Sequence, residues 1–360
     1  MTETDWVGTG WANRRVLVTG HTGFKGAWLC EWLLAMGAQV SGLARAPCTT
    51  PALFTQLGLA KRIQHHVIAD ITDAKALAGV LKAADPEVVF HLAAQSLVRV
   101  SYRDPVETWR TNVMGTAAVL EALRLRDRPA ATVVVTTDKV YENREWVHGY
   151  RETDRLGGHD PYSASKAGTE LVAASYRTSF LAAGPVRMAT ARAGNVIGGG
   201  DWAEDRLVPD IFRAITAGQP VEIRNPGSVR PWQHVLDPLA GYLKLAEALL
   251  SDAAKVHETG YNFGPDARDN RTVGEVVAAV LHHMPGAEWR DASDRPKPSE
   301  AGLLRLSIDK ARSALGWSPR WDFETAIAHT AQWYGGVAGG EDPGDLTRAQ
   351  IADFQTGATL

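Results

Sequence analysis

The sequence predicts the α/β fold class, with a doubly wound parallel sheet followed by a smaller α/β lobe. Short β-branched runs alternate with helical patterns through the first half of the chain, as in parallel strands joined by crossover helices. These runs are apolar throughout, as expected of strands covered on both faces. After Arg192 the pattern changes to short strands, helices and loops rich in Gly and Pro, which predicts the smaller lobe.

Each predicted strand and helix rests on a local sequence pattern. Residues 15–19 (RVLVT) predict the first strand and residues 26–36 the helix after it; further strands are expected at 38–43, 87–92 and 132–137. Apolar residues recur at helical spacing over 105–125, and 161–181 predicts a second long helix with proline at its start. In the second lobe we expect helices at 207–217, 239–250 and 273–284, and extended segments at 221–224, 231–235 and 261–263. The glycine-rich chain from Gly335 is expected to be loosely ordered.

Composition restricts the class of protein. The 360 residues are 45% hydrophobic and 22% charged, as in a globular protein, and the net charge of −3 argues against a nucleic-acid partner. The two cysteines, Cys30 and Cys48, lie in no metal-ligand motif, so we expect no metal site and a reducing, cytoplasmic location. No stretch predicts a membrane span, and Glu3 and Asp5 are unlike the start of a signal peptide, so no membrane partner is expected.

A glycine-rich turn directly follows the first predicted strand. The segment 20–26 (GHTGFKG) has GxxGxxG spacing and opens a helix. Such a turn is tight, lets the backbone approach a pyrophosphate, and points helix N–H groups at the phosphates. No Gly-Lys-Ser/Thr follows, which excludes a P-loop. We therefore predict a dinucleotide-binding, Rossmann-type domain with contacts from Gly20, Thr22, Gly23, Phe24, Lys25 and Gly26.

Three further segments belong to the same predicted cofactor site. Asp70 and Ile71 follow a strand-like run and are placed to contact the adenine, while Leu92, Ala93 and Ala94 would let the cofactor lie close to the backbone. NAD-specific sheets usually carry an acidic residue at the end of strand two. Here Ala44 stands at that place, followed by Arg45, which could hold a 2′-phosphate. We expect NAD, with NADP left open.

A tyrosine and a lysine form a candidate proton-transfer pair. Tyr162 and Lys166 are four residues apart on a predicted helix and therefore share a face. A nearby ammonium lowers the pKa of a phenol, and such a tyrosine can take a proton from an alcohol as hydride leaves the carbon. An exposed pair without function is the alternative. Thr137, at the end of a central strand, favours the catalytic interpretation because its hydroxyl can bond the same substrate oxygen.

Five long motifs carry a resemblance to a known family. They are 20–28 (GHTGFKGAW), 136–143 (TTDKVYEN), 162–170 (YSASKAGTE), 193–202 (AGNVIGGGDW) and 230–237 (RPWQHVLD). Through them the chain, from about residue 11 to 334, resembles the extended short-chain dehydrogenases/reductases, within them the sugar-nucleotide 4,6-dehydratases, and most closely those acting on CDP-glucose. The resemblance implies oxidation at glucose C4, water loss across C5 and C6, and hydride return to C6. The product would be a 4-keto-6-deoxy sugar nucleotide for deoxysugar and lipopolysaccharide O-antigen synthesis.

The sequence departs from the dTDP-glucose relatives at the elimination pair, which is Asp-Glu there and Asp138-Lys139 here. Asp138 could act as the acid if burial raises its pKa, and Lys139 as the base if desolvation or a neighbouring cation holds it neutral. The lysine is a feature shared with the CDP-glucose enzymes. The resemblance also implies substrate contacts from Ser96, Arg99, Asn195, Arg206, Leu207, Arg230 and His234.

The resemblance also implies how the chain is divided and assembled. We expect a dinucleotide-binding domain at 1–192, to which 235–265 return, a discontinuous substrate-binding lobe at 193–345, and a tail at 346–360. A homodimer or a dimer of dimers would form through the helices 105–125 and 161–181. The alternatives are a 4,6-dehydratase for GDP-mannose or dTDP-glucose, a nucleotide-sugar 4-epimerase, and a non-catalytic NAD(P)-binding sensor.

Overall fold

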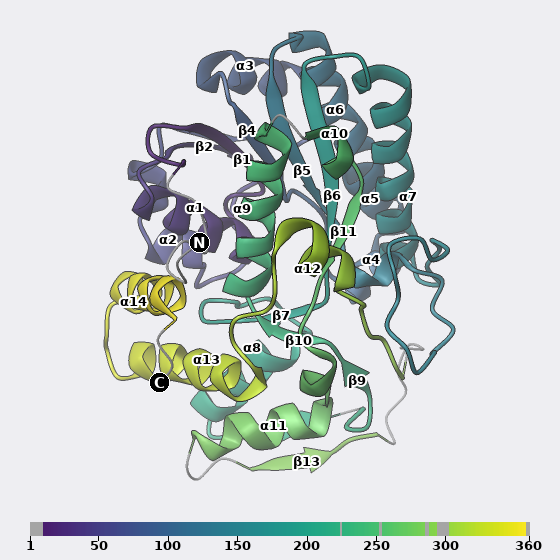
Figure 1. Ribbon diagram of the computed structural model, residues 1–360. Coiled ribbons are helices and arrows are strands. Elements are labelled where there is room, and N and C mark those ends of the chain that lie inside the picture. Colours follow the sequence, from purple (N-terminus) through teal and green to yellow (C-terminus); the bar gives the residue numbers. More distant parts are fainter. Residues whose placement is uncertain (1–9, 224, 252–253, 285–287, 294–301, 358–360) are drawn as a thin grey trace.

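A parallel sheet of seven strands forms the centre of the protein (Figure 1). The computed structural model describes residues 10–223, 225–251, 254–284, 288–293 and 302–357. Outside them lie Glu3 and Asp5, Arg224 at the end of a predicted strand, and residues 358–360 of the predicted tail. The sheet strands are β1 (Arg15–Thr19), β2 (Gln39–Ala44), β3 (His65–Ile68), β4 (Val88–His91), β5 (Ala130–Val135), β6 (Val186–Ala193) and β11 (Gly260–Phe263).

The strand order is β11-β6-β5-β4-β1-β2-β3, which confirms the predicted α/β class. The chain winds outward from β1 in both directions, because β2 pairs with one side of β1 and β4 with the other. In a doubly wound sheet, the point where the winding reverses leaves a crevice at the carboxyl ends of the strands. The glycine turn after β1 lies at this crevice.

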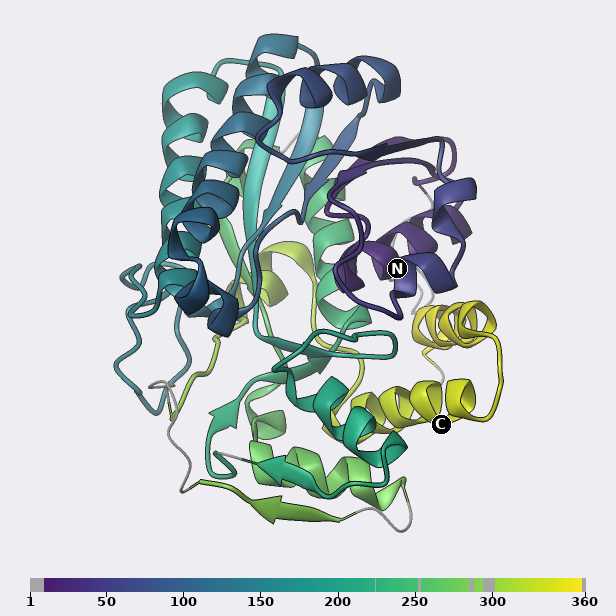
Figure 2. The same ribbon diagram turned by 180° about the vertical axis from the view of Figure 1, so that it is seen from behind.

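Helices cover both faces of the sheet, as Figures 1 and 2 show. One face carries α3 (Ala74–Ala84), α6 (Gly115–Arg126) and α7 (Pro161–Tyr176), and the other α1 (Phe24–Ala35) and α9 (Leu236–Leu250). Strand β1 shows why both faces are apolar: Leu17 packs with the first set of helices, whereas Val16 and Val18 pack with the second.

The two long predicted helices are present, but each contains a π-helical turn. Residues 105–126 form α5 (Pro105–Trp109), the turn η2 (Arg110–Met114) and α6. Likewise α7 runs into the turn η4 (Arg177–Leu181). A π turn accommodates one extra residue without ending the helix, so apolar spacing alone does not reveal it.

A smaller lobe lies below the sheet in Figure 1 and consists of helices and short strand pairs. Its helices include α8 (Leu207–Thr216) and α11 (Val273–His282), whereas α12 (Asp309–Leu315) packs against β11 and α9. Its strands pair as β7 (Asn195–Ile197) with β10 (Trp232–His234), β8 (Val221–Ile223) with β13 (Trp289–Asp291), and β9 (Val229–Arg230) with β12 (Arg271–Thr272). The short elements of the protein are α2 (Leu53–Gln56), η1 (Leu59–Lys61), α4 (Val98–Arg103), η3 (Asp138–Val140), α10 (Ala254–His257) and η5 (Ala267–Asp269).

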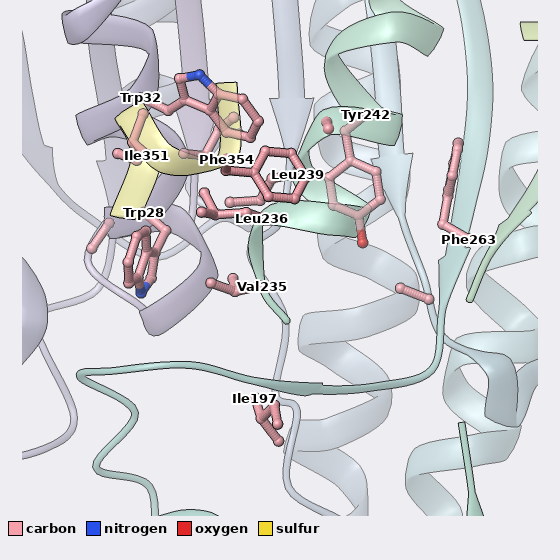
Figure 3. Packing of buried hydrophobic residues seen from close by; sticks show 14 of the residues in the cluster. Trp28, Trp32, Ile197, Val235, Leu236, Leu239, Tyr242, Phe263, Ile351 and Phe354 are labelled. Atoms are coloured by element: carbon pink, nitrogen blue, oxygen red, sulfur yellow. The ribbon is translucent and has the colours of Figure 1, made fainter. Parts of the chain in front are cut away.

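The expectation of a loosely ordered chain from Gly335 is wrong. That region forms the end of α13 (Phe323–Ala338) and all of α14 (Pro343–Thr356), whose first turn is capped by Asp342. Figure 3 shows Phe354 and Ile351 of α14 beside Trp32 of α1, and the Phe354 and Trp32 ring centroids are 5.6 Å apart. Burial of these apolar side chains outweighs the low helix propensity of the glycines.

Candidate active site

The glycine turn after β1 is closely packed, and its geometry suits a bound dinucleotide. Gly20 has φ +77°, and a Cβ there would lie 2.7 Å from the backbone nitrogen of Ala93. Gly23 precedes α1 without a side-chain cap, and the first turn of α1 carries no acidic residue. The helix therefore presents free N–H groups and the positive end of its dipole, which fits a pyrophosphate.

The predicted adenosine contacts gather beside this turn. Thr22 Oγ1 donates a hydrogen bond of 2.8 Å to the carbonyl of Arg45, which ties the turn to the end of β2. Asp70 Oδ1 accepts from the backbone and hydroxyl of Thr72, and Ile71 is buried against Gly115. Arg45 is mostly exposed and pairs with Glu107 at 3.2 Å.

The floor of the cleft is formed by the chain after β4. Leu92, Ala93 and Ala94 are half-buried there, next to the glycine turn. The backbone nitrogen of Leu92 bonds to the carbonyl of Thr19 at 3.1 Å, and that of Ala93 to the Thr19 hydroxyl at 3.3 Å. The small side chains of Ala93 and Ala94 leave the backbone accessible to a flat ring of the cofactor.

Tyr162 and Lys166 lie on the first two turns of α7, as predicted. The helix begins at Pro161 after Asp160, whose carboxylate accepts from the Ser163 nitrogen at 2.9 Å. Lys166 Nζ donates to the carbonyl of Val135, at the end of β5, over 3.1 Å. This bond holds the ammonium beneath the strand end that leads to Thr137.

The expected lowering of the Tyr162 pKa is wrong for this structure. Burial raises the pKa of Tyr162 to about 12, and a hydrogen bond with Thr137 offsets this only in part. Burial also lowers the pKa of Lys166 to about 8, against the opposing influence of Glu170. Removal from water therefore dominates both pKa values, and neither residue is among the causes of the other's shift.

Asp138 meets the condition for a role as the acid, which is that burial raises its pKa. It is buried, its Oδ1 accepts a 2.9 Å hydrogen bond from Thr137, and its Oδ2 has no hydrogen-bond partner in the described part of the chain. Burial raises the pKa of Asp138, against the lowering effect of Lys139 and Arg230. Lys139 is half-buried in η3, directly next to it.

Lys25, predicted only as part of the phosphate turn, also faces the catalytic residues. Its ammonium donates to the Tyr242 hydroxyl at 3.5 Å. Burial, with the neighbouring Arg206 and Lys166, lowers the pKa of Lys25 to about 7. The sequence placed Lys25 in the correct turn, but only the folded chain shows that its side chain extends from α1 toward α7 and α9.

Three predicted substrate residues meet at the edge of the cleft. Arg206 donates to the Ser96 hydroxyl at 3.2 Å and to Asp201 Oδ2 at 2.9 Å, and Arg99 pairs with Asp205 at 2.6 Å. Neither Asp201 nor Asp205 was predicted from the sequence as a site residue. Asp201 lies in the matched segment 193–202 (AGNVIGGGDW), so its place in that motif was an available signal.

The remaining substrate candidates lie along the smaller lobe. Leu207 begins α8 and lines a cavity of about 450 Å³ together with Asp210 and Val221. Asn195 opens β7 opposite Trp232 of β10. Arg230 is buried in β9, donates to the carbonyl of Val229, and is close enough to Asp138 to lower that carboxyl's pKa.

The prediction that His234 contacts the substrate finds no support in the structure. The side chain has no exposed surface and lies among Trp28, Trp321 and His329, with ring centroids 4.7 Å from Trp321. Burial lowers the pKa of His234 well below its usual value. These aromatic neighbours give the residue a neutral packing position in the core.

Within the described residues, no group of His, Cys, Asp and Glu has a metal-site arrangement. None of the helices in that part of the chain is long and apolar enough to span a membrane.

Comparison with known proteins agrees with this geometry. The family model described as GDP-mannose 4,6-dehydratase matches residues 17–330. The chain belongs to this family. A CDP-glucose 4,6-dehydratase of Salmonella typhimurium is 46% identical over 355 residues, covering 97% of this chain and 98% of the relative. A dTDP-glucose 4,6-dehydratase of Xanthomonas campestris pv. campestris is 31% identical, covering 88% and 92%.

Solved structures of the 4,6-dehydratase family superpose on most of the chain. The dTDP-glucose 4,6-dehydratase of Streptomyces venezuelae, solved with NAD bound, is 26% identical with a TM-score of 0.77, covering 91% of this chain and 99% of that one. An epimerase from Methanothermobacter thermautotrophicus shares the fold at 24% identity and a TM-score of 0.78, covering 95% and 96%. The resemblance inferred from the motifs is thereby confirmed.

Proposed function

We propose that the protein is an NAD-dependent CDP-glucose 4,6-dehydratase, which forms CDP-4-keto-6-deoxy-D-glucose. The observation that carries this proposal is the 46% identity to the Salmonella enzyme over nearly the full length of both chains. The Asp138-Lys139 pair supports it independently, because it supplies two acid–base groups at the end of β5. An epimerase needs no such pair, and a sensor needs neither this pair nor Tyr162.

The catalytic residues divide the reaction between them. Tyr162, as the phenolate, accepts the proton of the C4 hydroxyl, the Thr137 hydroxyl positions the same oxygen, and Lys166 lies one turn further along the same face of α7. NAD bound at the glycine turn would supply the hydride acceptor for oxidation at C4 and the hydride donor for C6. The C4 ketone acidifies the C5 hydrogen, which Lys139 removes, while Asp138 protonates the C6 hydroxyl, which leaves as water. The proton held by Lys139 returns to C5 as hydride reaches C6.

The substrate would lie across both parts of the chain. Arg206 and Arg230 suit the diphosphate, because guanidinium groups match its oxygens, with Asn195 beside them. Ser96 and Arg99 would contact the sugar hydroxyls, and Leu207 the nucleoside. We accordingly propose the division into a cofactor domain at 1–192, with the return of 235–265, and a substrate lobe from residue 193 onward. The 346–356 part of the predicted tail is instead helix α14.

We further propose that the protein is a cytoplasmic homodimer, which can pair into a dimer of dimers. The outward sides of α5, η2 and α7 expose large apolar side chains, among them Val106, Met114 and Leu171. Apolar side chains gathered on two adjacent helices fit a symmetric contact with a second copy.

The function is tested by incubating the purified protein separately with CDP-glucose, dTDP-glucose, GDP-mannose and UDP-glucose, with mass spectrometry of each product. Loss of one water from CDP-glucose is the expected result. Water loss from another sugar nucleotide alone would keep the mechanism and overturn the substrate. A product of unchanged mass would indicate epimerisation, and no reaction with any donor would favour a sensor.

A further inference from the structure

The proposed function does not say which residue of the cofactor site distinguishes NAD from NADP, and the end of β2 bears on this. NAD differs from NADP only at the ribose 2′-position, which in this fold lies beyond the end of the second strand. Many NAD-binding sheets place a carboxylate there, but this chain has Ala44 and then Arg45, an arrangement that by itself would favour a 2′-phosphate.

A carboxylate near Arg45 is supplied by α5 instead of β2. Glu107 lies in the first turn of α5, where its backbone nitrogen donates to the capping carboxylate of Asp104 at 3.1 Å. Its Oε1 accepts from Arg45 at 3.2 Å and from the Thr111 hydroxyl at 3.2 Å, and its Oε2 accepts from Arg110 at 3.0 Å. One carboxylate thus engages both arginines.

A second carboxylate faces the same arginines from the end of β3. Arg110 donates to Thr72 Oγ1 at 2.7 Å and lies 4.0 Å from Asp70 Oδ1. The charged groups around this position are therefore Arg45, Arg110, Glu107 and Asp70, two of each sign. The local charge is balanced, so a phosphate would not meet an uncompensated positive site.

We propose that Glu107 makes the cofactor site selective for NAD over NADP. Glu107 engages Arg45 and Arg110 and places negative charge where a 2′-phosphate would lie, whereas a 2′-hydroxyl can donate a hydrogen bond to the same carboxylate. The inference deepens the proposed function, because it rests on a dinucleotide bound at the glycine turn. It does not depend on which sugar nucleotide is the substrate.

Both ion pairs are partly exposed, so their own contribution to stability is small. Replacing Glu107 should therefore leave the fold intact. The effect on a bound phosphate should be larger, because removing the carboxylate eliminates a repulsion and releases two cations at the same time.

The test is equilibrium binding of NAD and NADP to nucleotide-free protein without any sugar nucleotide, measured by calorimetry on wild type and Glu107→Gln. We expect the Kd ratio of NADP to NAD to fall about tenfold or more in the variant, equivalent to about 1.4 kcal/mol. Adding Arg45→Met to Glu107→Gln should remove most of this gain. Glu121→Gln, which breaks a similar exposed pair with Arg124 on α6, is the matched control and should leave the ratio unchanged.

An unchanged ratio in Glu107→Gln, with thermal unfolding like that of wild type, would overturn the inference. A tenfold change in the Glu121→Gln control would do the same, because the effect would then not be specific to Glu107. Wild-type protein that binds neither dinucleotide would overturn the proposed cofactor and this inference with it. Wild type that binds NAD but does not react with CDP-glucose would overturn only the substrate.

Discussion

Asp138 is buried beside Thr137, whose hydroxyl donates a hydrogen bond to it, and burial raises the pKa of Asp138. The folded protein thus holds the Asp138 proton more tightly than the unfolded chain does. Such a group contributes stability that is fully present below the unfolded pKa of about 3.9 and is lost as pH rises through the raised folded pKa. Wherever the carboxyl is ionised, its charged form destabilises the fold, a cost that is acceptable at a catalytic position.

Asp138→Asn should separate these two effects. We expect turnover to fall about 100-fold or more, because the amide cannot protonate the departing hydroxyl. The variant should unfold at a higher temperature than wild type at pH 8, with the difference shrinking toward pH 4. Thermal unfolding across this pH range, with turnover measured by mass spectrometry, checks both. A variant less stable than wild type at pH 8 would contradict the assigned burial cost.

Lys139→Met tests the neighbouring residue. If Lys139 removes the C5 proton, oxidation at C4 proceeds in the variant but elimination slows by about 100-fold or more. Reduced nicotinamide should then accumulate on the enzyme, which absorbance in a single-turnover experiment detects. Lys75→Met, an exposed lysine on α3, serves as the control. Normal turnover in Lys139→Met would exclude this role.

The site residues that the sequence located are those whose placement follows from local geometry. Tyr162 and Lys166 share a helical face because they are four residues apart, and the glycine turn follows its strand directly. Glu107 was not singled out, because its partner Arg45 is distant in sequence and the two side chains meet only in the folded chain. For His234 the motif gave a position in the chain but not the burial of its side chain, and its substrate contact stays a prediction.

Helix α7 is fixed to the sheet by a buried ion pair. Glu170 pairs with Arg192 of β6 at 2.8 Å and also accepts from Thr136 after β5 and Thr190 of β6. Arg192 lowers the pKa of Glu170 despite its burial. The pair joins the helix that carries Tyr162 to the strand end that carries Thr137, so it sets the distance between the two catalytic groups.

Glu170→Gln should therefore be strongly destabilising. The amide leaves Arg192 buried without its counter-charge, which typically costs about 3–5 kcal/mol. Urea unfolding measures the change, and Glu121→Gln, at the exposed pair with Arg124, should cost less than about 1 kcal/mol. Equal effects of the two substitutions would show that burial of the pair does not matter.

Helix α14 gives a prediction that the sequence alone would not have suggested. Phe354 is fully buried and lies 5.1 Å, between ring centroids, from Trp321 and close to Trp32. Phe354→Ala should lower the free energy of unfolding by about 3–5 kcal/mol through the cavity that it leaves. The control Leu125→Ala, at an exposed position of α6, should change it by less than about 0.5 kcal/mol. A result for Phe354→Ala as small as the control's would mean that α14 does not pack as described.

The central elements followed closely from the sequence, and the terminal ones did not. Strand β1 begins and ends at the predicted residues, because an unbroken apolar run before a glycine turn allows no other boundary. The glycines of α13 suggested a loose chain, because local propensity does not report the tryptophans and histidine against which that segment packs. Whether such segments form helices depends on packing against residues that are distant in sequence.

The proposed homodimer contact uses the outward side of α5, η2 and α7. Gly168 of α7 lies close to Trp109 of α5, since a Cβ on it would be 3.2 Å from that ring, so the two elements are closely packed and present one continuous surface. Val106, Met114 and Leu171 are all more than half exposed on these elements, with exposed fractions of 76%, 60% and 62%. An apolar surface of this kind is costly in a monomer and is removed from water in a two-fold dimer.

Leu171→Arg should consequently convert the protein to a monomer. Two symmetry-related arginines would be buried near each other without partners, a penalty that a dimer contact of ordinary size does not overcome. Light scattering coupled to size exclusion should give a mass near 38.9 kDa for the variant and a multiple of it for wild type. Val256→Arg, on the equally exposed α10, is the control and should leave the wild-type mass unchanged. A wild-type protein that is already monomeric, or a Leu171→Arg variant with the wild-type mass, would show that this surface is not the dimer contact.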